Sequence, residues 1–171
     1  VIIQKKLYNL LGMLWIKDVI SILYPELLVL LALVLAIILS TTKNKSLIWL
    51  SSVILMLSGL VHIIKTQIHL VEPVQILSGA FIADNLSILF RGLILLTSIL
   101  VIIGSIKYSE GFIHKSEFMI ALLSAVLGAM FLVGANDLVT LFVALETMGL
   151  SSIILIGYSK YDTRSNEAAI K

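Results

Sequence analysis

The sequence has 171 residues, of which 60% are hydrophobic and 13% are charged, and its formal net charge is +2. Soluble domains carry about 25% charged residues, so this composition and a mean hydropathy of +1.12 exclude an ordinary soluble fold and indicate an all-α polytopic membrane protein. Cysteine is absent, which excludes disulfides and thiolate-held metal or iron–sulfur sites in this chain, and the small net charge argues against nucleic acid as a partner.

Residues 1–20 are predicted to form an N-terminal amphipathic arm. Apolar residues recur at helical spacing, with polar residues on the opposite face: Leu7, Leu10, Leu11, Leu14 and Trp15 against Lys6, Asn9 and Lys17. Such a helix lies at a membrane interface or packs on a neighbouring subunit, and the pattern does not choose between the two. The apolar run that follows is long and has no small-residue cleavage pattern, so we expect it to remain as an anchor.

The segment 21–158 is predicted to be a five-helix transmembrane domain. A span needs about 20 apolar residues to cross a ~30 Å hydrocarbon core, and five stretches meet this length, at about 21–40, 47–64, 84–106, 118–134 and 137–158. Residues 159–171 are polar and are predicted to be an inner-side loop leading to a sixth helix that the sequence does not contain.

Polar residues near the ends of the first two spans are given structural interpretations. Pro25 fits the first turn of a helix, where its missing N–H is unsatisfied anyway, and Glu26 beside it would meet the positive end of that helix. His62 lies near the end of the second span and is interpreted as an interfacial hydrogen-bonding residue and not as a ligand.

The third and fourth spans carry a cap, an arginine and a small-residue pair. Asp84 and Asn85 stand in capping positions, and Arg91 lies seven residues after Asp84 on the same face, from which it could extend back toward that helix end. Ser124 and Gly128 have the small-xxx-small spacing that permits close helix contact.

The fifth span contains a lone charge, Glu146, between a cap at Asn136 and Asp137 and an exit at Gly157. A mid-membrane carboxylate costs an inserted helix about 2.5–3.5 kcal/mol, so a chain that retains one usually uses it to carry a proton or a small ion. The structural alternative is a glutamate that locks helices together by hydrogen bonds, for example with Thr147 or Ser151. No cationic partner is evident in the five spans.

The distribution of lysine and arginine outside the spans gives an orientation. One side holds more of them than the other: Lys43, Lys45, Lys107, Lys115, Lys160, Arg164 and Lys171 against Lys5, Lys6, Lys17 and Lys65. The positive-inside rule places the richer side in the cytoplasm or matrix, so the N-terminus is expected outside and the C-terminus inside.

The segment 134–171 resembles the fifth helix and the following loop of subunit 2 of respiratory complex I, the proton-pumping NADH:quinone oxidoreductase. The resemblance rests on a small–Asn–Asp–Leu start, a Leu–Glu pair and a polar loop that leads to a lysine: Asn136, Asp137, Leu138, Leu145, Glu146, Arg164, Ser165, Glu167, Ala168 and Lys171. Subunits 4 and 5 and the membrane subunits of cation/proton antiporters share a similar glutamate helix.

The resemblance implies the front part of an antiporter-like bundle of some fourteen helices, built from inverted five-helix repeats. It implies that Glu146 is an intramembrane proton-relay carboxylate and that Lys171 belongs to the same relay. It also implies an enzyme assembly, an NADH:ubiquinone reductase, in which NADH, FMN, iron–sulfur clusters and ubiquinone are handled by other subunits and no cofactor is held by this chain.

The partners implied are a second-half chain of a split subunit 2, other membrane-arm subunits and lipids. The expected location is the mitochondrial inner membrane or, alternatively, the bacterial plasma membrane. Two other functions stay open: a structural membrane subunit without conduction, and a fragment of a cation/proton antiporter.

Overall fold

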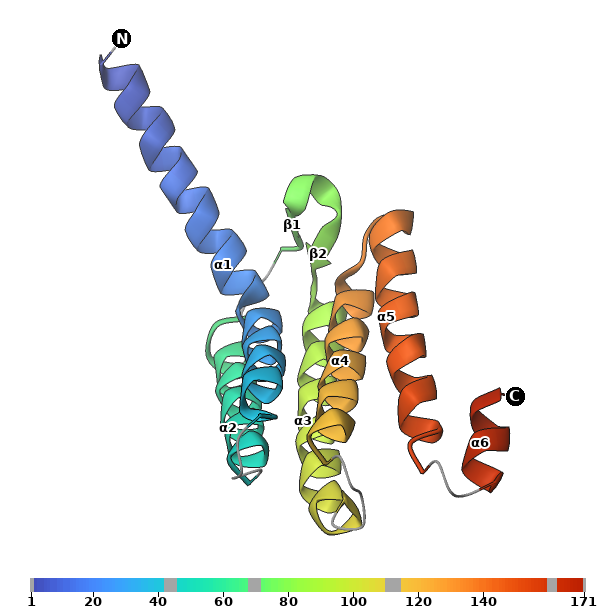
Figure 1. Ribbon diagram of the computed structural model, residues 1–171. Coiled ribbons are helices and arrows are strands. Elements are labelled where there is room, and N and C mark those ends of the chain that lie inside the picture. The colour runs from blue at the N-terminus through green and yellow to red at the C-terminus, as the bar shows by residue number, and fades with distance from the viewer. Residues whose placement is uncertain (1, 42–45, 68–71, 110–114, 160–162, 171) are drawn as a thin grey trace.

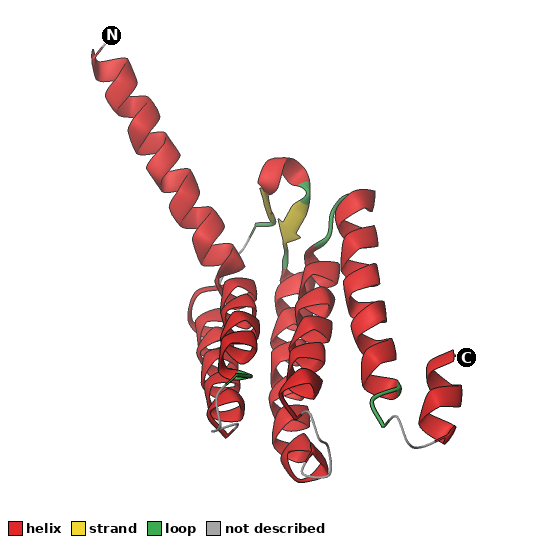
Figure 2. Ribbon diagram, viewed as in Figure 1, coloured by secondary structure: helices red, strands yellow, loops and turns green. Residues whose placement is uncertain are grey.

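The computed structural model describes residues 2–41, 46–67, 72–109, 115–159 and 163–170, with side chains from residue 19 onward. Among these residues, five helices are long and apolar enough to cross a membrane: Val19–Leu39, Ser46–Thr66, Asn85–Tyr108, Lys115–Gly134 and Leu138–Ile156. The predicted polytopic helical class with five spans is confirmed, and the five helices stand side by side, alternating in direction (Figures 1 and 2).

The first helix, α1 (Ile2–Leu39), joins the predicted arm and the first span without a break. Pro25 therefore lies inside a helix, and its predicted place in a first turn is wrong, as is the placement of Glu26 at a positive helix end. Proline removes a backbone hydrogen bond and bends a helix, and Figure 1 shows α1 changing direction between its N-terminal part and the bundle. Neighbouring helices satisfy the carbonyls that such a bend frees in membrane proteins.

Helices α1 to α4 build the hydrophobic core. The helix α2 (Ser46–His62) continues into a π-helical turn, η1 (Ile63–Gln67), and α3 (Asn85–Tyr108) and α4 (Lys115–Gly134) follow. The helix α4 is central, since it contacts α1, α3 and α5 and half of its spanning window is buried. The core contains fully buried apolar side chains from each helix, among them Val29, Met56, Leu95 and Met130.

A short hairpin precedes α3. The strands β1 (Val74–Ile76) and β2 (Phe81–Ala83) pair antiparallel around a 3-10 turn, η2 (Leu77–Gly79). The Phe81 ring is fully buried against Gly134 at the end of α4, where a Cβ atom on residue 134 would collide with the ring. The hairpin was not predicted from the sequence, and it ties the segment before α3 to the corner between α4 and α5.

The last two helices are α5 (Leu138–Ile156) and the short α6 (Thr163–Ile170). The predicted loop over 159–171 is wrong for Thr163–Ile170, because this segment contains the good helix formers Glu167, Ala168 and Ala169 and its Ser165 hydroxyl donates to the Ile156 carbonyl at the end of α5. Residues 160–162 and Lys171 lie outside the described residues.

Candidate functional site

The start of α5 is fixed by its cap and by the hairpin. Asp137 caps the helix by accepting the Thr140 backbone N–H at 2.8 Å, as predicted, and hydrogen bonds from the side chain and backbone of Thr140 lower the pKa of Asp137. Asn136 does not cap the helix but holds the hairpin, since its backbone N–H donates to the Ala80 carbonyl and its side chain donates to the Gly79 carbonyl. These contacts fix the position of the first turn of α5 relative to the hairpin.

Helix α5 packs closely on α4 through one small residue. A Cβ atom on Gly128 would lie 2.7 Å from the backbone nitrogen of Met148 and 3.1 Å from the Ala144 carbonyl oxygen. Ala144 is the buried residue of α5 at this contact. The predicted close contact at Gly128 is therefore confirmed, whereas the Ser124 hydroxyl bonds within its own helix, to the Ile120 carbonyl.

Glu146 lies on the open side of α5. It is exposed, and no hydrogen bond or ion pair joins it to another of the described residues. Thr147 and Ser151 donate instead to backbone carbonyls one turn earlier in α5, those of Val143 and Thr147. The described residues thus contain no glutamate lock of the kind that the structural alternative requires.

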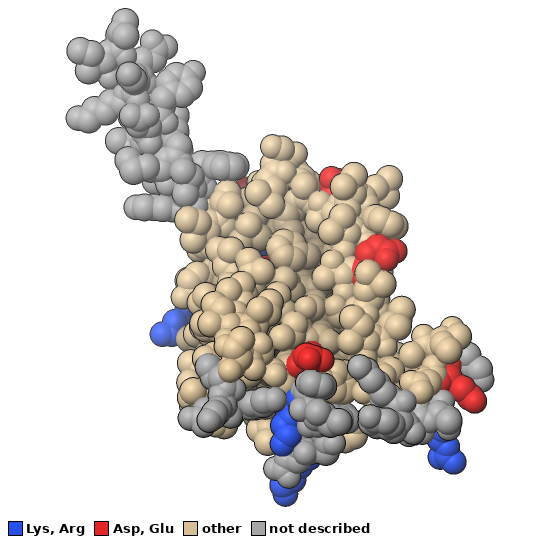
Figure 3. Space-filling view, in the orientation of Figure 1, with Lys and Arg blue, Asp and Glu red and all other residues tan. Residues whose placement is uncertain are grey.

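The whole of α5 is much less covered than the other spans. Only 11% of its spanning window is buried, against 33–50% for the other four. A groove of about 400 Å³ lies between α4 and α5 and is lined mainly by apolar side chains, together with Thr140 and Thr147. Figure 3 shows a largely uncharged side surface, with most of the visible basic atoms at the end opposite the hairpin. Helix α5 therefore presents a face that other protein or lipid must cover.

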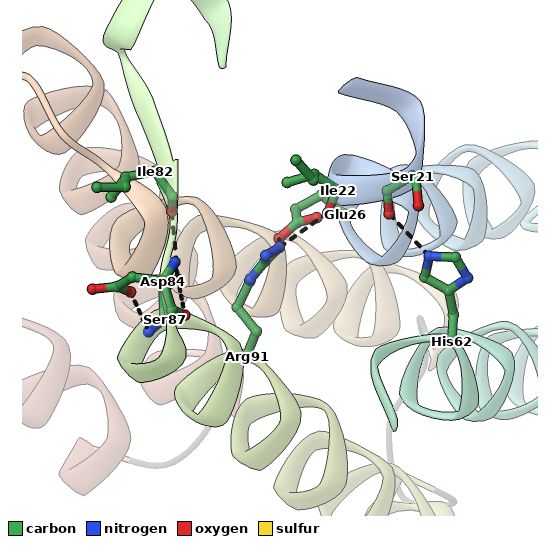
Figure 4. A network of polar contacts seen from close by, with 8 residues as sticks. All are labelled: Ser21, Ile22, Glu26, His62, Ile82, Asp84, Ser87 and Arg91. Carbon is green, nitrogen blue, oxygen red and sulfur yellow. Dashed lines mark hydrogen bonds and ion pairs between the residues drawn. The ribbon is translucent and has the colours of Figure 1, made fainter. Parts of the chain in front are cut away.

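A second charged site lies inside the bundle and was missed from the sequence. Arg91 does not extend back toward the end of α3; it is fully buried and donates to the Glu26 carboxylate (Nη1 to Oε1, 3.1 Å) and to the Ile22 carbonyl at 3.1 Å (Figure 4). The Phe81 ring lies against its guanidinium, 5.5 Å from ring centroid to Cζ. The interpretation of Arg91 as a residue that reaches the helix end is wrong, because the buried carboxylate of α1 offers it an opposite charge.

One signal in the sequence could have found this pair. Glu26 stands five residues after the start of the predicted span 21–40, and Arg91 stands seven residues after the start of the predicted span 84–106. Helices α1 and α3 run in the same direction (Figure 1), so two opposite charges at similar depth in these spans can pair.

The bend in α1 explains a further polar contact. Pro25 has no N–H to donate to the Ser21 carbonyl one turn earlier, and the ring nitrogen Nε2 of His62 lies 2.9 Å from that oxygen (Figure 4). The Tyr24 ring packs on the same histidine at 4.4 Å between centroids. The predicted hydrogen-bonding role of His62 is confirmed, and the histidine joins α2 to the bend in α1.

Metal ligands do not gather in the described part of the chain, where no three His, Asp or Glu residues come together. Lys171, the second predicted site residue, lies outside the described residues, so its distance from Glu146 is not defined.

Comparison with known proteins assigns residues 135–171 to a family described as NADH:quinone oxidoreductase/Mrp antiporter, transmembrane. The chain is 48% identical over 116 residues to NAD(P)H-quinone oxidoreductase subunit 2 of Synechococcus elongatus, covering 67% of this chain and 22% of the relative. It is 54% identical over 101 residues to the subunit 2 of a Picosynechococcus species, covering 58% of this chain and 19% of the relative. It is 42% identical over 174 residues to the chloroplastic subunit 2 of Chaetosphaeridium globosum, covering 99% of this chain and 33% of the relative. The chain thus spans between 19% and 33% of the length of these curated relatives.

Proposed function

The chain belongs to the antiporter-like membrane family that contains subunit 2 of the NAD(P)H-quinone oxidoreductases, and from this premise we propose that it takes part in proton translocation by such a complex, with Glu146 as an intramembrane relay carboxylate. The observation that carries the proposal is the position of Glu146. It lies eight residues after the start of α5 at Leu138, or about 12 Å into the span, on the open face of the least covered helix. It also falls inside the segment that the family description matches.

A change in its surroundings would let a carboxyl group in a membrane span bind and release a proton. Burial in an apolar environment favours the neutral form of a carboxyl group, and a nearby cation favours the charged form. A covering helix that brings a cation to Glu146 and then withdraws it would make the carboxylate release and rebind a proton. The complementary cation comes from outside the described residues, and Lys171 is the candidate that this chain itself contains.

The remaining expectations form part of the same proposal. The chain holds no redox centre, and NADH, FMN, iron–sulfur clusters and the quinone are bound by other subunits of the assembly. Its partners are the other membrane-arm subunits and lipids. The membrane is that of an organelle or a bacterium. The relatives named above come from cyanobacteria and a chloroplast, so they support a bacterial or chloroplast membrane more than a mitochondrial one.

The orientation also stays a proposal. The C-terminal ends of α1, α3 and α5 lie at one end of the bundle, and the hairpin lies at the other (Figure 1). Since the connections that follow these three helices in the sequence carry more lysine and arginine, we place that end on the inner side of the membrane and the N-terminus outside.

The test is a measurement of proton translocation in assembled complexes that carry Glu146→Gln. Translocation is measured while the complex oxidises its electron donor, NAD(P)H or another reduced donor. This variant keeps the side-chain volume and removes the charge, so we expect the protons moved per donor oxidised to fall while the complex still assembles. Glu167→Gln is the matched control, because Glu167 is an exposed glutamate of α6 in the same family segment. Unchanged translocation in an assembled Glu146→Gln complex would refute the relay and favour a structural subunit.

A cation/proton antiporter is the second candidate, because the family description covers both kinds of protein. Sodium-dependent proton exchange by the purified assembly, without oxidation of a nicotinamide donor, would favour the antiporter. Donor-dependent proton translocation that is independent of sodium would favour the oxidoreductase.

A further inference from the structure

The Glu26–Arg91 pair is the most deeply buried charged site of the described bundle. Glu26 is 1% exposed and Arg91 is 0% exposed, and only one carboxylate oxygen, Oε1, receives the guanidinium. The other oxygen, Oε2, has no hydrogen-bond partner among the described residues. Buried carboxylate oxygens are nearly always bonded, so this one is a place where a proton or a water molecule can bind.

Stability alone does not account for the pair. A buried ion pair is often no better for stability than apolar side chains of similar volume, because both ions lose their hydration. The core that adjoins the pair is apolar and contains the fully buried Leu95 of α3 and Val29 of α1. Two apolar residues would join α1 to α3 as well, so an ionisable pair at this position suggests a chemical role.

A third ionisable residue, Asp84, stands on α3 between the pair and the hairpin end of the bundle. Asp84 caps α3 seven residues before Arg91 and is partly exposed, and it forms a capping box with Ser87 (Figure 4). Hydrogen bonds from the backbone and side chain of Ser87 lower the pKa of Asp84, and the nearby charge of Arg91 lowers it further. Asp84, Arg91 and Glu26 thus form a series that runs from the partly exposed cap into the fully buried core.

The hairpin covers Arg91 through the side chain of Phe81. Phe81 of β2 is fully buried and its ring lies against the Arg91 guanidinium. The same ring fills the place beside Gly134 at the α4–α5 corner. A small movement of the hairpin would therefore change both the cover over Arg91 and the support of the corner from which α5 begins.

We propose that Glu26 is a second proton-binding carboxylate of this subunit, which exchanges its proton with the outer side along Asp84 and Arg91 under the cover of Phe81. A proton from the outer water forms an O–H bond with Oε2 of Glu26, and Arg91 keeps its own charge and its bond to the Ile22 carbonyl. When the proton leaves, the carboxylate is again the counter-ion of Arg91. No electron is transferred in this step.

Few other charged or titratable groups of the described residues face Glu26. Helix α3 brings Arg91, with Asp84 at its cap, and α2 brings His62, which is turned to the Ser21 carbonyl on α1. The charged side chains of α4, Lys115 and Glu117, stand in its first turn at the far end of the bundle. Among these groups, only Arg91 is in direct contact with the Glu26 carboxylate. This inference rests on the proposed function, since a second proton site has a role only in a subunit that transfers protons.

The test is infrared difference spectroscopy of the assembled complex in membranes, recorded across a pH titration with and without exchange into heavy water. We expect a carboxylic-acid C=O band that shifts in heavy water, is present in the wild type and in Glu72→Gln, and is lost in Glu26→Gln. Glu72 is the matched control because it is an exposed glutamate before the hairpin at the same end of the bundle. Persistence of the band in an assembled Glu26→Gln complex, or no such band in the wild type at any pH, would overturn the proposal.

The single variant leaves Arg91 without its carboxylate, so it can fail to assemble. The double variant Glu26→Gln/Arg91→Gln removes both charges and keeps polar groups that can bond to each other. We expect this variant to assemble, to lack the band and to translocate fewer protons per donor oxidised than the wild type. Wild-type translocation by the assembled double variant would show that the pair is only structural.

This experiment is separable from the test of the proposed function. Loss of the infrared band in Glu26→Gln does not depend on Glu146, so it would support the Glu26 site even if Glu146→Gln were silent. A reduced translocation in Glu146→Gln without any Glu26 band would support the proposed function and reject the second site.

Discussion

The two acidic sites of the bundle, Glu26 and Glu146, have opposite surroundings. Both stand inside apolar helices long enough to span a membrane, Glu26 in α1 and Glu146 in α5. Glu26 is buried against Arg91 within the chain, whereas Glu146 is exposed and has no partner among the described residues. A carboxylate in a membrane needs a counter-ion or a proton, and the described residues supply the counter-ion in the first case only.

This difference separates two parts of the bundle: helices α1 to α4, whose core is packed within the chain, and helix α5, most of which is uncovered. Helices α1 to α4 share one core, and their charged pair contributes to the contact between α1 and α3. Helix α5 attaches to that core through Gly128 and Ala144 and leaves most of its surface uncovered. Substitutions in the first part should therefore affect folding, and substitutions at Glu146 should affect what the assembly does.

Arg91→Leu should have the largest effect on folding. It leaves the Glu26 carboxylate buried without its cation, and breaking a buried pair on one side typically costs about 3–5 kcal/mol. We expect the chain to be largely lost from membranes and from the assembled complex, as measured by quantitative immunoblotting. Glu146→Leu is the comparison, and it should leave the level of the chain close to that of the wild type. Equal loss in both variants would contradict the distinction between the two sites.

Gly128→Ala should weaken the packing of α5 on α4. The added Cβ would lie 2.7 Å from the Met148 backbone nitrogen, so a backbone has to shift, and overpacking of this kind costs about 1–3 kcal/mol. Gly149→Ala is the matched control, since a Cβ there has open space within 4 Å and alanine favours a helix over glycine. We expect thermal unfolding of the solubilised complex to begin at a lower temperature for Gly128→Ala only. The same shift for both variants would show that the α4–α5 contact is not specific.

Asp84→Asn should have the smallest effect, and only in acid. The pKa of Asp84 is lowered in the fold, first by the Ser87 hydrogen bonds, so its contribution is present above the ordinary value of 3.8 and is lost as the pH falls through the lower, folded value. Asparagine also caps helices, so the stability near neutral pH should hardly change. We expect the wild type to lose stability over this acid range more steeply than Asp84→Asn. Parallel pH profiles would rule out this contribution.

The sequence predicted the features that depend on neighbouring residues. The five spans follow from continuous apolar length, and the caps at Asp84 and Asp137 follow from their position just before such runs. The close contact at Gly128 follows from its size and spacing. The spans, the caps and the close contact each depend on residues of a single helix and its immediate neighbours in the sequence.

The features that the sequence analysis missed depend on how distant segments meet. Glu26 and Arg91 are 65 positions apart and were each explained within their own helix, although their similar depth in the predicted spans was a usable signal. The strands of the hairpin have three residues each, too few for a periodic pattern, and they are held largely by Phe81, Gly134 and Asn136. The helix α1 continues through Pro25 because side chains of other helices bond to the carbonyls beside the bend. His62 bonds to the Ser21 carbonyl, and Arg91 bonds to the Ile22 carbonyl.

The most direct test of the difference between the two sites is photo-crosslinking from position 146 in the assembled complex. A photoreactive amino acid incorporated there reports what lies against the open face of α5. We predict adducts with a protein segment outside residues 19–159, which would bring the cation that Glu146 needs. Adducts with lipid alone would contradict the account, because a carboxylate that faces only lipid has no partner with which to exchange a proton.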